Sequence, residues 1–201
     1  MELETSDWPY TATEDHHHHI PIDLFGSKKH AGLPRGILSF ADSSGNILFK
    51  VHPQPPNPNS ISSPPPKNIK LLLDPNDVPL FSIHRHHNGN WKCYKGSGDG
   101  EKEIMFEVKR TVKTFTRIEL EVNFSGERLN GDVCDLRVLG SPFKRSCSIY
   151  KNTDLVAQSS LMYKLNQIYV SRSKFRLTIF PGSMDHAVVV ALFVIFLNGR
   201  K

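Results

Sequence analysis

Apolar and polar residues alternate with a period of two in several segments of the chain. In "TRIELEVNF", Ile118, Leu120 and Val122 share one face, and the charged residues between them share the other. The segment "SKFRLTIF" near the C-terminus repeats the pattern. Because this period is that of a strand with one buried and one solvated face, both segments are predicted to be β-strands.

Turn residues divide the first half of the chain into hairpins. "ILSFADSSGNILFKV" has two apolar runs about a turn at Asp42–Asn46, and "IKLLLDPNDVPLFSIHRH" has two about Asp74–Asp77. Asn88 and Gly89 mark a further hairpin. Short strands are also expected around 105–109, 135–139, 147–150 and 155–158. About a dozen short strands at regular spacing predict a barrel or a sandwich.

The chain is apolar at every position from Ala187 to Leu197. This run is too short for a transmembrane helix, which needs about 20 apolar residues. A buried strand and a helix buried on all sides both fit it. The helix is favoured because Ser183 or Asp185 can cap its start, and Gly199 can end it in a left-handed conformation.

A helix that is apolar on all sides must be enclosed by the rest of the protein. In a chain made otherwise of strands, the enclosing object is a sheet curled around the helix. A helix over about 184–198 is about 22 Å long, close to the height of a barrel with six-residue strands. We therefore expect a mainly β (α+β) protein: a closed antiparallel barrel of about twelve strands around a buried hydrophobic C-terminal helix.

Two stretches lie outside this pattern. Residues 1–19 are acidic and then His-rich, and 52–68 ("HPQPPNPNSISSPPPKN") hold much of the chain's proline. The first predicts a disordered tail and the second a long, exposed, disordered loop, because proline cannot donate the backbone hydrogen bonds of a sheet. Residues 20–201 are expected to form a single domain.

The chain is basic, with a formal net charge of +5 and a pI near 9.1. This charge favours anionic partners, although it fits equally well a role in solubility alone. Three cysteines without CxxC spacing favour a reducing compartment, and the acidic N-terminus does not resemble a signal peptide. A cytoplasmic protein is expected, with attachment to a membrane surface or presence in the nucleus as further options.

Clustered cations are the candidate anion-binding residues. Arg172, Lys174 and Arg176 alternate along one strand, so all three are expected on the outer face of the barrel. Lys109 and Lys113 are expected to share a second outer face. The solvated outer face of a sheet is the favoured explanation of both groups.

A third group of cations, the pair Lys144 and Arg145, lies in "SPFKRSCSIY". Adjacent residues of an incipient strand point to opposite faces, so the two side chains are not expected to contact one ligand together. They are candidates for a role at the barrel rim.

No metal site, cofactor or catalytic site is predicted. His84 and His86 share a strand face near Cys93, but no further ligand has suitable spacing, and His16–His19 fit a solvated tract. The sequence contains no GxSxG, P-loop or HExxH motif. The protein is therefore not expected to be an enzyme.

Four motifs resemble the LURP-one-related proteins of plants, a group within the tubby-like and phospholipid-scramblase-like folds. They are "FADSSGNILFKV", "LLLDPNDVPLFSIHR…NWKCYKG", "GSPFKRSCSIY" and "FRLTIFPGSMDHAVVVALFVIFLNG". The resemblance covers roughly 20–200 and implies a barrel of about twelve strands threaded by a C-terminal helix. It also implies a link to plant defence, and tubby-like domains are known to bind phosphoinositide headgroups.

The resulting functional hypothesis is a non-enzymatic binding or scaffold module that recognises anionic membrane lipid, with a phosphoinositide as one option, or an unidentified protein partner. It is expected to be a monomer without a transmembrane segment. The alternative is a nuclear, DNA-associated regulator of the tubby-like kind, although the sequence has no helix-turn-helix or zinc finger.

Overall fold

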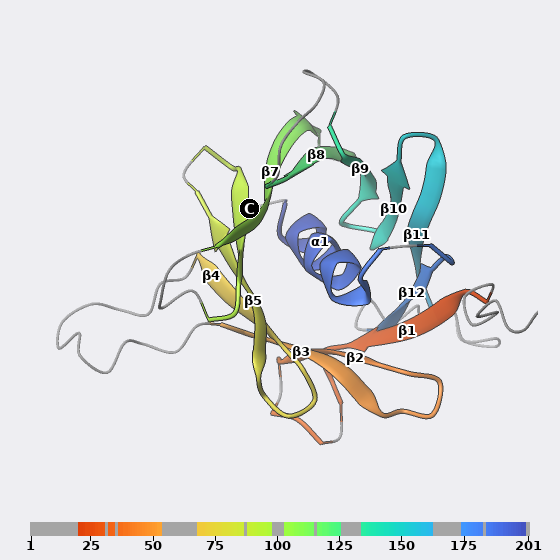
Figure 1. Ribbon diagram of the computed structural model, residues 1–201. Helices are drawn as coiled ribbons and strands as arrows, with labels where there is room; N and C mark the ends of the chain where they lie inside the picture. Colours follow the sequence, from red (N-terminus) through yellow and green to blue (C-terminus); the bar gives the residue numbers. More distant parts are fainter. Residues whose placement is uncertain are drawn as a thin grey trace, which may run out of the picture.

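The computed structural model shows twelve antiparallel strands closed into one barrel around a single helix (Figure 1). The structure describes residues 20–30, 32–34, 36–53, 68–86, 88–97, 103–114, 116–125, 134–162, 174–182 and 184–199. The strands are β1 (Ile22–Ser27), β2 (Leu38–Ala41), β3 (Ile47–Pro53), β4 (Ile69–Leu73), β5 (Pro79–Arg85), β6 (Trp91–Lys95), β7 (Ile104–Lys113), β8 (Ile118–Phe124), β9 (Leu136–Ser141), β10 (Ser146–Lys151), β11 (Asp154–Leu161) and β12 (Lys174–Ile179). The predicted fold class is confirmed.

Each strand pairs with its neighbours in the sequence, and β1 closes the barrel. It pairs with β2 on one side and with β12 on the other, where Leu24 stands opposite Leu177. The sequence pattern did not point to β1. Its alternation is short and is interrupted by Gly26, which leaves Leu24 as the apolar residue that marks its inner face.

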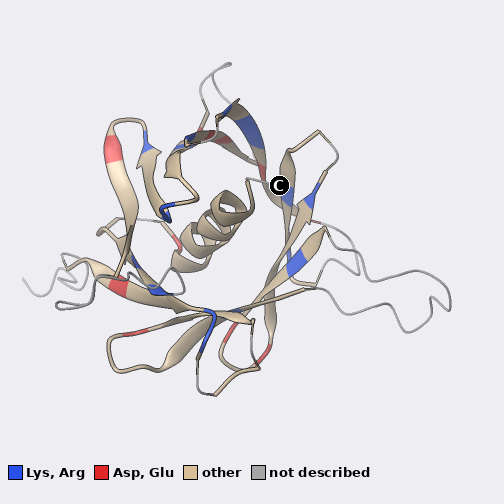
Figure 2. Ribbon diagram, turned by 180° about the vertical axis from the view of Figure 1, so that it is seen from behind, with Lys and Arg blue, Asp and Glu red and all other residues tan. Residues whose placement is uncertain are grey.

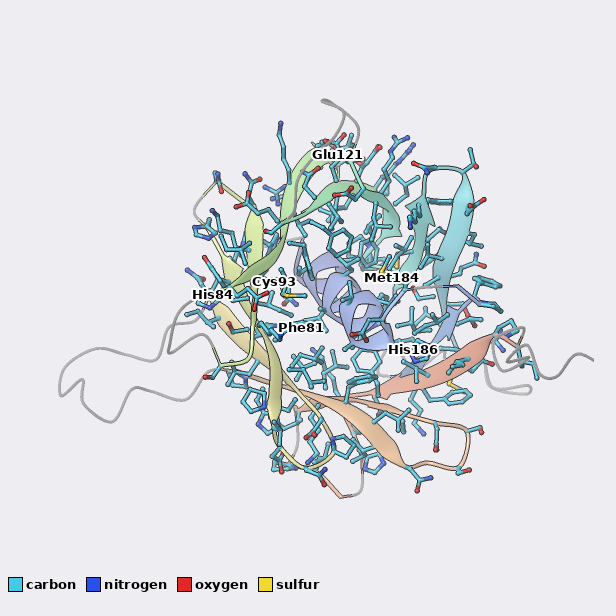
Figure 3. The ribbon with its side chains drawn as sticks, in the orientation of Figure 1. Phe81, His84, Cys93, Glu121, Met184 and His186 are labelled. Atoms are coloured by element: carbon cyan, nitrogen blue, oxygen red, sulfur yellow. The ribbon has the colours of Figure 1, made fainter. Side chains whose placement is uncertain are left out.

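The period-two pattern assigns the inner face correctly. On β8 the side chains of Ile118, Leu120 and Val122 are almost fully buried, as the alternation predicts. Figure 3 shows Phe81 and Cys93 directed from β5 and β6 toward the helix.

The helix α1 (His186–Asn198) fills the barrel. It begins two residues later than predicted, because Asp185 is the N-cap and accepts a hydrogen bond from the Ala187 backbone N–H at 2.8 Å. Every residue from Ala187 to Phe196 is buried, and Figure 2 shows no charged residue along the helix. None of the helices in the described part of the chain has the length and apolar character that crossing a membrane requires.

Gly199 ends the helix, but not in the predicted left-handed conformation. Its φ is −64° and ψ is −11°, and its N–H donates to the Phe196 carbonyl. Glycine is favoured here by close packing, because a Cβ atom would lie 3.1 Å from Cδ1 of Ile118. The side chain of β8 thus comes close to the end of the helix.

One boundary of the proline-rich stretch differs from the prediction. His52 and Pro53 belong to β3, where they pair with Leu71 and Lys70. Pro53 is tolerated because it is the last residue of its strand. The rest of the stretch, 54–67, and the predicted tail 1–19 lie outside the described residues.

Candidate functional site

The cations predicted on β12 point outward, but an acid accompanies them. Arg176 Nη1 lies 3.6 Å from Oδ2 of Asp23 on β1, and Oδ1 of the same carboxylate accepts a hydrogen bond from Thr178 Oγ1 at 2.6 Å. Lys174 is exposed at the start of the strand. Arg172 lies outside the described residues. The β12 face is therefore a mixed surface, with Lys174 at its edge.

Lys109 and Lys113 do not share a face, and that prediction is wrong. Lys109 stands opposite Glu121 on the outside, but the register then shifts at Thr111, so that Lys113 stands opposite Ile118. Directly opposite residues in an antiparallel pair share a face, and Ile118 points into the barrel. The bulge thus moves Lys113 off the outer face that carries Lys109, and its side chain is exposed at the very end of β7.

Lys144 and Arg145 lie in a turn, not in an incipient strand as predicted, because β10 begins at Ser146. Lys144 is exposed. Arg145 is half-buried, and its guanidinium carbon lies 5.3 Å from the centroid of the Phe175 ring. Its φ of 50° is in the left-handed region, which arginine rarely adopts. The two neighbouring cations therefore have different surroundings.

Two cations that the sequence did not single out contact the end of α1. Lys70 Nζ lies 2.7 Å from Oδ1 of Asn198, and Arg110 Nη1 donates to the Gly199 carbonyl at 2.9 Å. Both come from inner-face positions opposite buried apolar residues. Cations stabilise a helix C-terminus, where the partial charge of the helix is negative.

The barrel has two ends, which we name after the ends of α1. The helix-end rim is the end where α1 finishes, and it carries the connections that follow β1, β3, β5, β7, β9 and β11. The helix-start rim carries the connections that follow the even-numbered strands, together with the N-cap of α1.

The two rims differ in charge. Among the described residues of the helix-end connections, which are 28–30, 32–34, 36–37, 68, 86, 88–90, 114, 116–117, 142–145 and 162, there is no Asp or Glu. The described cations at or beside this rim include Lys28, Lys29, Lys70, Arg85, Arg110, Lys113, Arg117, Lys144, Arg145 and Lys174. The described part of every helix-start connection contains at least one acid except 152–153, which Asp154 follows directly. The barrel is therefore polarised along its axis.

The flanks of the barrel carry mixed charge. Glu119 on the outer face of β8 is hydrogen-bonded by Arg137 and lies 3.7 Å from Arg117 Nη2. The bond to Glu119 raises the pKa of Arg137 above its ordinary value. Lys92 Nζ lies 2.7 Å from Oε1 of Glu107. Cations on the flanks thus stand beside acids, and among the cations of the helix-end rim Arg117 shares one of these acids, Glu119.

Within the described residues, no three His, Cys, Asp or Glu side chains come together as a metal site would require. His84 is half-buried opposite Lys92, and its Nε2 lies 3.2 Å from Ser82 Oγ. Cys93 points into the barrel core instead (Figure 3). The histidine and the cysteine therefore do not face one another.

The cysteines are free thiols in surroundings that disfavour the thiolate. Burial raises the pKa of Cys93 far above its ordinary value and raises that of Cys147 to about 12. Cys134 is half-buried, and burial raises its pKa as well. Because the thiolate is the nucleophile, Cys93 and Cys147 are poorly suited to catalysis.

The fold and the rims define a class of protein: an antiparallel barrel whose interior is filled by its own C-terminal helix, and which carries opposite charges at its two ends. The LURP-one-related family model matches residues 22–197, and the chain belongs to this family. Protein LURP-one-related 7 of Arabidopsis thaliana is 49% identical over 98% of this chain and 100% of its own length.

Two further similarities agree with this assignment. LURP-one-related 13 of Arabidopsis thaliana is 31% identical and covers 77% of this chain and 76% of its own length. An X-ray structure of an Arabidopsis thaliana protein superimposes with a TM-score of 0.60 at 26% identity, covering 90% of this chain and 91% of that one. The barrel is thus shared with an experimentally determined structure.

Proposed function

We propose that this protein is a non-enzymatic binding module that attaches to anionic phospholipid surfaces through its helix-end rim. The observation that carries the proposal is the charge polarity of the barrel. A rim with many cations and no acids in the described part of its connections is attracted to an anionic surface, whereas the acidic opposite rim is repelled. The polarity therefore favours one orientation on a membrane.

The strength of such an attachment depends on the number of cations. Each Lys or Arg close to an anionic membrane contributes about 1 kcal/mol, within about one Debye length of the surface. Lys29, Lys113 and Lys144 are exposed at the helix-end rim. Together with their neighbours they are sufficient for reversible binding.

Apolar side chains at the same rim add to this surface. Phe143, next to Lys144 in its turn, is 40% exposed, and Met162 at the end of β11 is 38% exposed. Aromatic and aliphatic side chains beside cations are typical of proteins that lie at a membrane interface. A peripheral position on a membrane, in the cytoplasm, is the location that the proposal implies.

The test is cosedimentation with phosphatidylcholine vesicles that contain or lack phosphatidylserine. Only the anionic vesicles should bind the protein. Lys29→Gln/Lys113→Gln/Lys144→Gln should weaken binding about 100-fold, at about 1 kcal/mol per charge. The matched control Lys95→Gln/Lys109→Gln/Lys151→Gln removes the same charge from the flank and the helix-start rim, and should change binding only slightly.

Equal losses of vesicle binding in both variants would contradict attachment through the helix-end rim. Binding to neutral vesicles would contradict an electrostatic mechanism. Duplex DNA is the competing polyanion, and the sequence left it open as the alternative. A salt-dependent mobility shift of DNA without any vesicle binding would support that alternative and overturn the membrane proposal.

A further inference from the structure

A cavity of about 220 Å³ opens at the helix-end rim. Its walls come from the segment after β1, from β3 and β4, and from the turn before β10, and Leu197 and Asn198 of α1 contribute the end of the helix. Its lining side chains include three cations, Lys28, Lys70 and Arg145, and the imidazole of His52. Asp and Glu are absent from the described residues that line it.

Lys70 is held at the cavity by the helix itself. Its Nζ lies 2.7 Å from Asn198 Oδ1, and the amide nitrogen of Asn198 donates to the Val194 carbonyl at 2.5 Å. The amide of Asn198 is therefore fixed on both sides. Because this amide is uncharged, the contact orients the ammonium group of Lys70 and leaves its positive charge in place.

Arg145 lines the cavity and has an unfavourable backbone conformation. The left-handed region is unfavourable for residues other than glycine, with Asn and Asp as the usual exceptions. A Gly or Asn at 145 would form the turn at lower cost, yet the chain has an arginine with φ of 50°. Strain of this kind is typical of residues that are positioned for binding.

His52 supplies a polar group that needs a partner. Its Nε2 atom is buried, and no group in the described part of the chain hydrogen-bonds to it. An unsatisfied buried polar atom is costly, and such an atom at the wall of a polar cavity is readily satisfied by a ligand or water. It is the second feature, independent of the lysines and Arg145, that indicates a ligand.

We propose that this cavity binds the phosphate of a phosphomonoester. The group is small enough for a cavity that can hold several waters. Its two negative charges and several acceptor oxygens match three cations and an imidazole better than a single carboxylate does. The inference deepens the proposed function, because it names the chemical group that the helix-end rim would recognise on a lipid headgroup or on a soluble phosphate ester.

The direct test is calorimetric titration of the full chain with inorganic phosphate and with inositol 1,4,5-trisphosphate. Arg145→Asn should weaken binding at least about tenfold, because it removes a charge-assisted hydrogen bond. Asn tolerates the left-handed conformation, so the variant should still fold. Lys151→Asn makes the same change in an exposed lysine outside the helix-end rim and should leave phosphate affinity unchanged.

A second pair of variants, outside the turn that contains Arg145, distinguishes a loss of binding from a folding defect in that turn. Lys28→Gln should weaken phosphate binding, while Lys95→Gln, an exposed lysine of the helix-start rim that does not line this cavity, should not. Absence of phosphate binding by the wild type, or equal effects within each pair, would overturn the cavity proposal.

Vesicle binding distinguishes phosphate recognition by the cavity from the proposed attachment to anionic membranes. Phosphatidic acid carries a phosphomonoester, whereas phosphatidylserine does not. Stronger binding to phosphatidic acid at equal surface charge, lost in Arg145→Asn, supports a lipid source for the phosphate. Phosphate binding without vesicle binding supports a soluble ester and contradicts only the membrane function. Equal binding to both lipids, unaffected by Arg145→Asn, contradicts only the cavity.

Discussion

The two rims of the barrel close their turns with different chemistry. At the helix-start rim carboxylates accept the backbone hydrogen bonds. Asp42 Oδ1 accepts from the Asn46 N–H at 2.9 Å, and Asp74 Oδ1 accepts from the N–H groups of Asn76 and Val78 at 2.8 Å. The acids at this rim therefore have a structural role that explains their presence.

At the helix-end rim the corresponding acceptors are neutral. The bonds run from Lys29 N to Ser27 Oγ at 3.0 Å, from Asn90 N to Asn88 Oδ1 at 3.1 Å and from Arg117 N to Thr114 Oγ1 at 3.0 Å. Asp, Asn, Ser and Thr can all close turns in this way. The turns of the helix-end rim could therefore also fold with Asp at these positions. A surface that binds anions, in contrast, requires that acids be absent from it.

Both rims rest on one shared core. The Val190→Asp variant tests this and should have the largest effect. Val190 is fully buried in α1, so the variant buries an unpaired charge at a cost of several kcal/mol, comparable with the whole stability of a domain. We expect loss of folded protein by circular dichroism. The control Val78→Asp changes a valine that is 53% exposed and should melt like the wild type.

Gly26→Ala should have the next largest effect and should disturb the core close to the helix-end rim. A Cβ at this position would lie 2.0 Å from the Phe175 ring, which packs against the rings of Phe40 and Phe193. Overpacking of this kind costs about 1–3 kcal/mol, measurable by urea denaturation. Gly182→Ala, where nothing lies within 4 Å, should be nearly neutral, and an equal loss there would contradict the packing explanation.

The core could be predicted from the sequence because it depends on local patterns. The alternation around Ile118 and Leu120, the turns at Asp42–Asn46 and Asp74–Asp77, and the apolar run of α1 each follow from a few neighbouring residues. A helix without a polar face needs an enclosing sheet, so these local patterns also gave the architecture. The exception was β1, whose alternation Gly26 interrupts.

The rim could not be predicted in the same way because it depends on register and on the end at which each connection lies. The bulge at Thr111 moves Lys113 off the outer face that carries Lys109, and no local pattern revealed it. Lys70 and Arg110 come to the end of α1 only when the barrel is closed. Acid-free and acidic connections alternate along the sequence. This alternation can be assigned to the two ends of the barrel only when the strands and their order are known.

Asn88→Asp/Thr114→Asp should have a smaller effect than Gly26→Ala, and this effect should concern binding alone. Both changes keep a turn acceptor and place a carboxylate on the helix-end rim. Stability should stay within about 0.5 kcal/mol of the wild type, while affinity for phosphatidylserine vesicles should fall at least about tenfold. If binding persists in cosedimentation, the absence of acids from this rim has no connection with anionic surfaces.

Asp42→Asn makes the reciprocal change at the helix-start rim and should have the smallest effect. Hydrogen bonds from the side chain and backbone of Asn46 lower the pKa of Asp42 below its ordinary value of 3.8. A lowered folded-state pKa contributes stability that is present above the ordinary value and is lost as the pH falls through the folded-state value. The wild type should therefore be slightly more stable than the variant at pH 7, and urea denaturation below pH 3 should show the two converging. Vesicle binding should not change, because the carboxylate at this rim serves the turn and not the ligand.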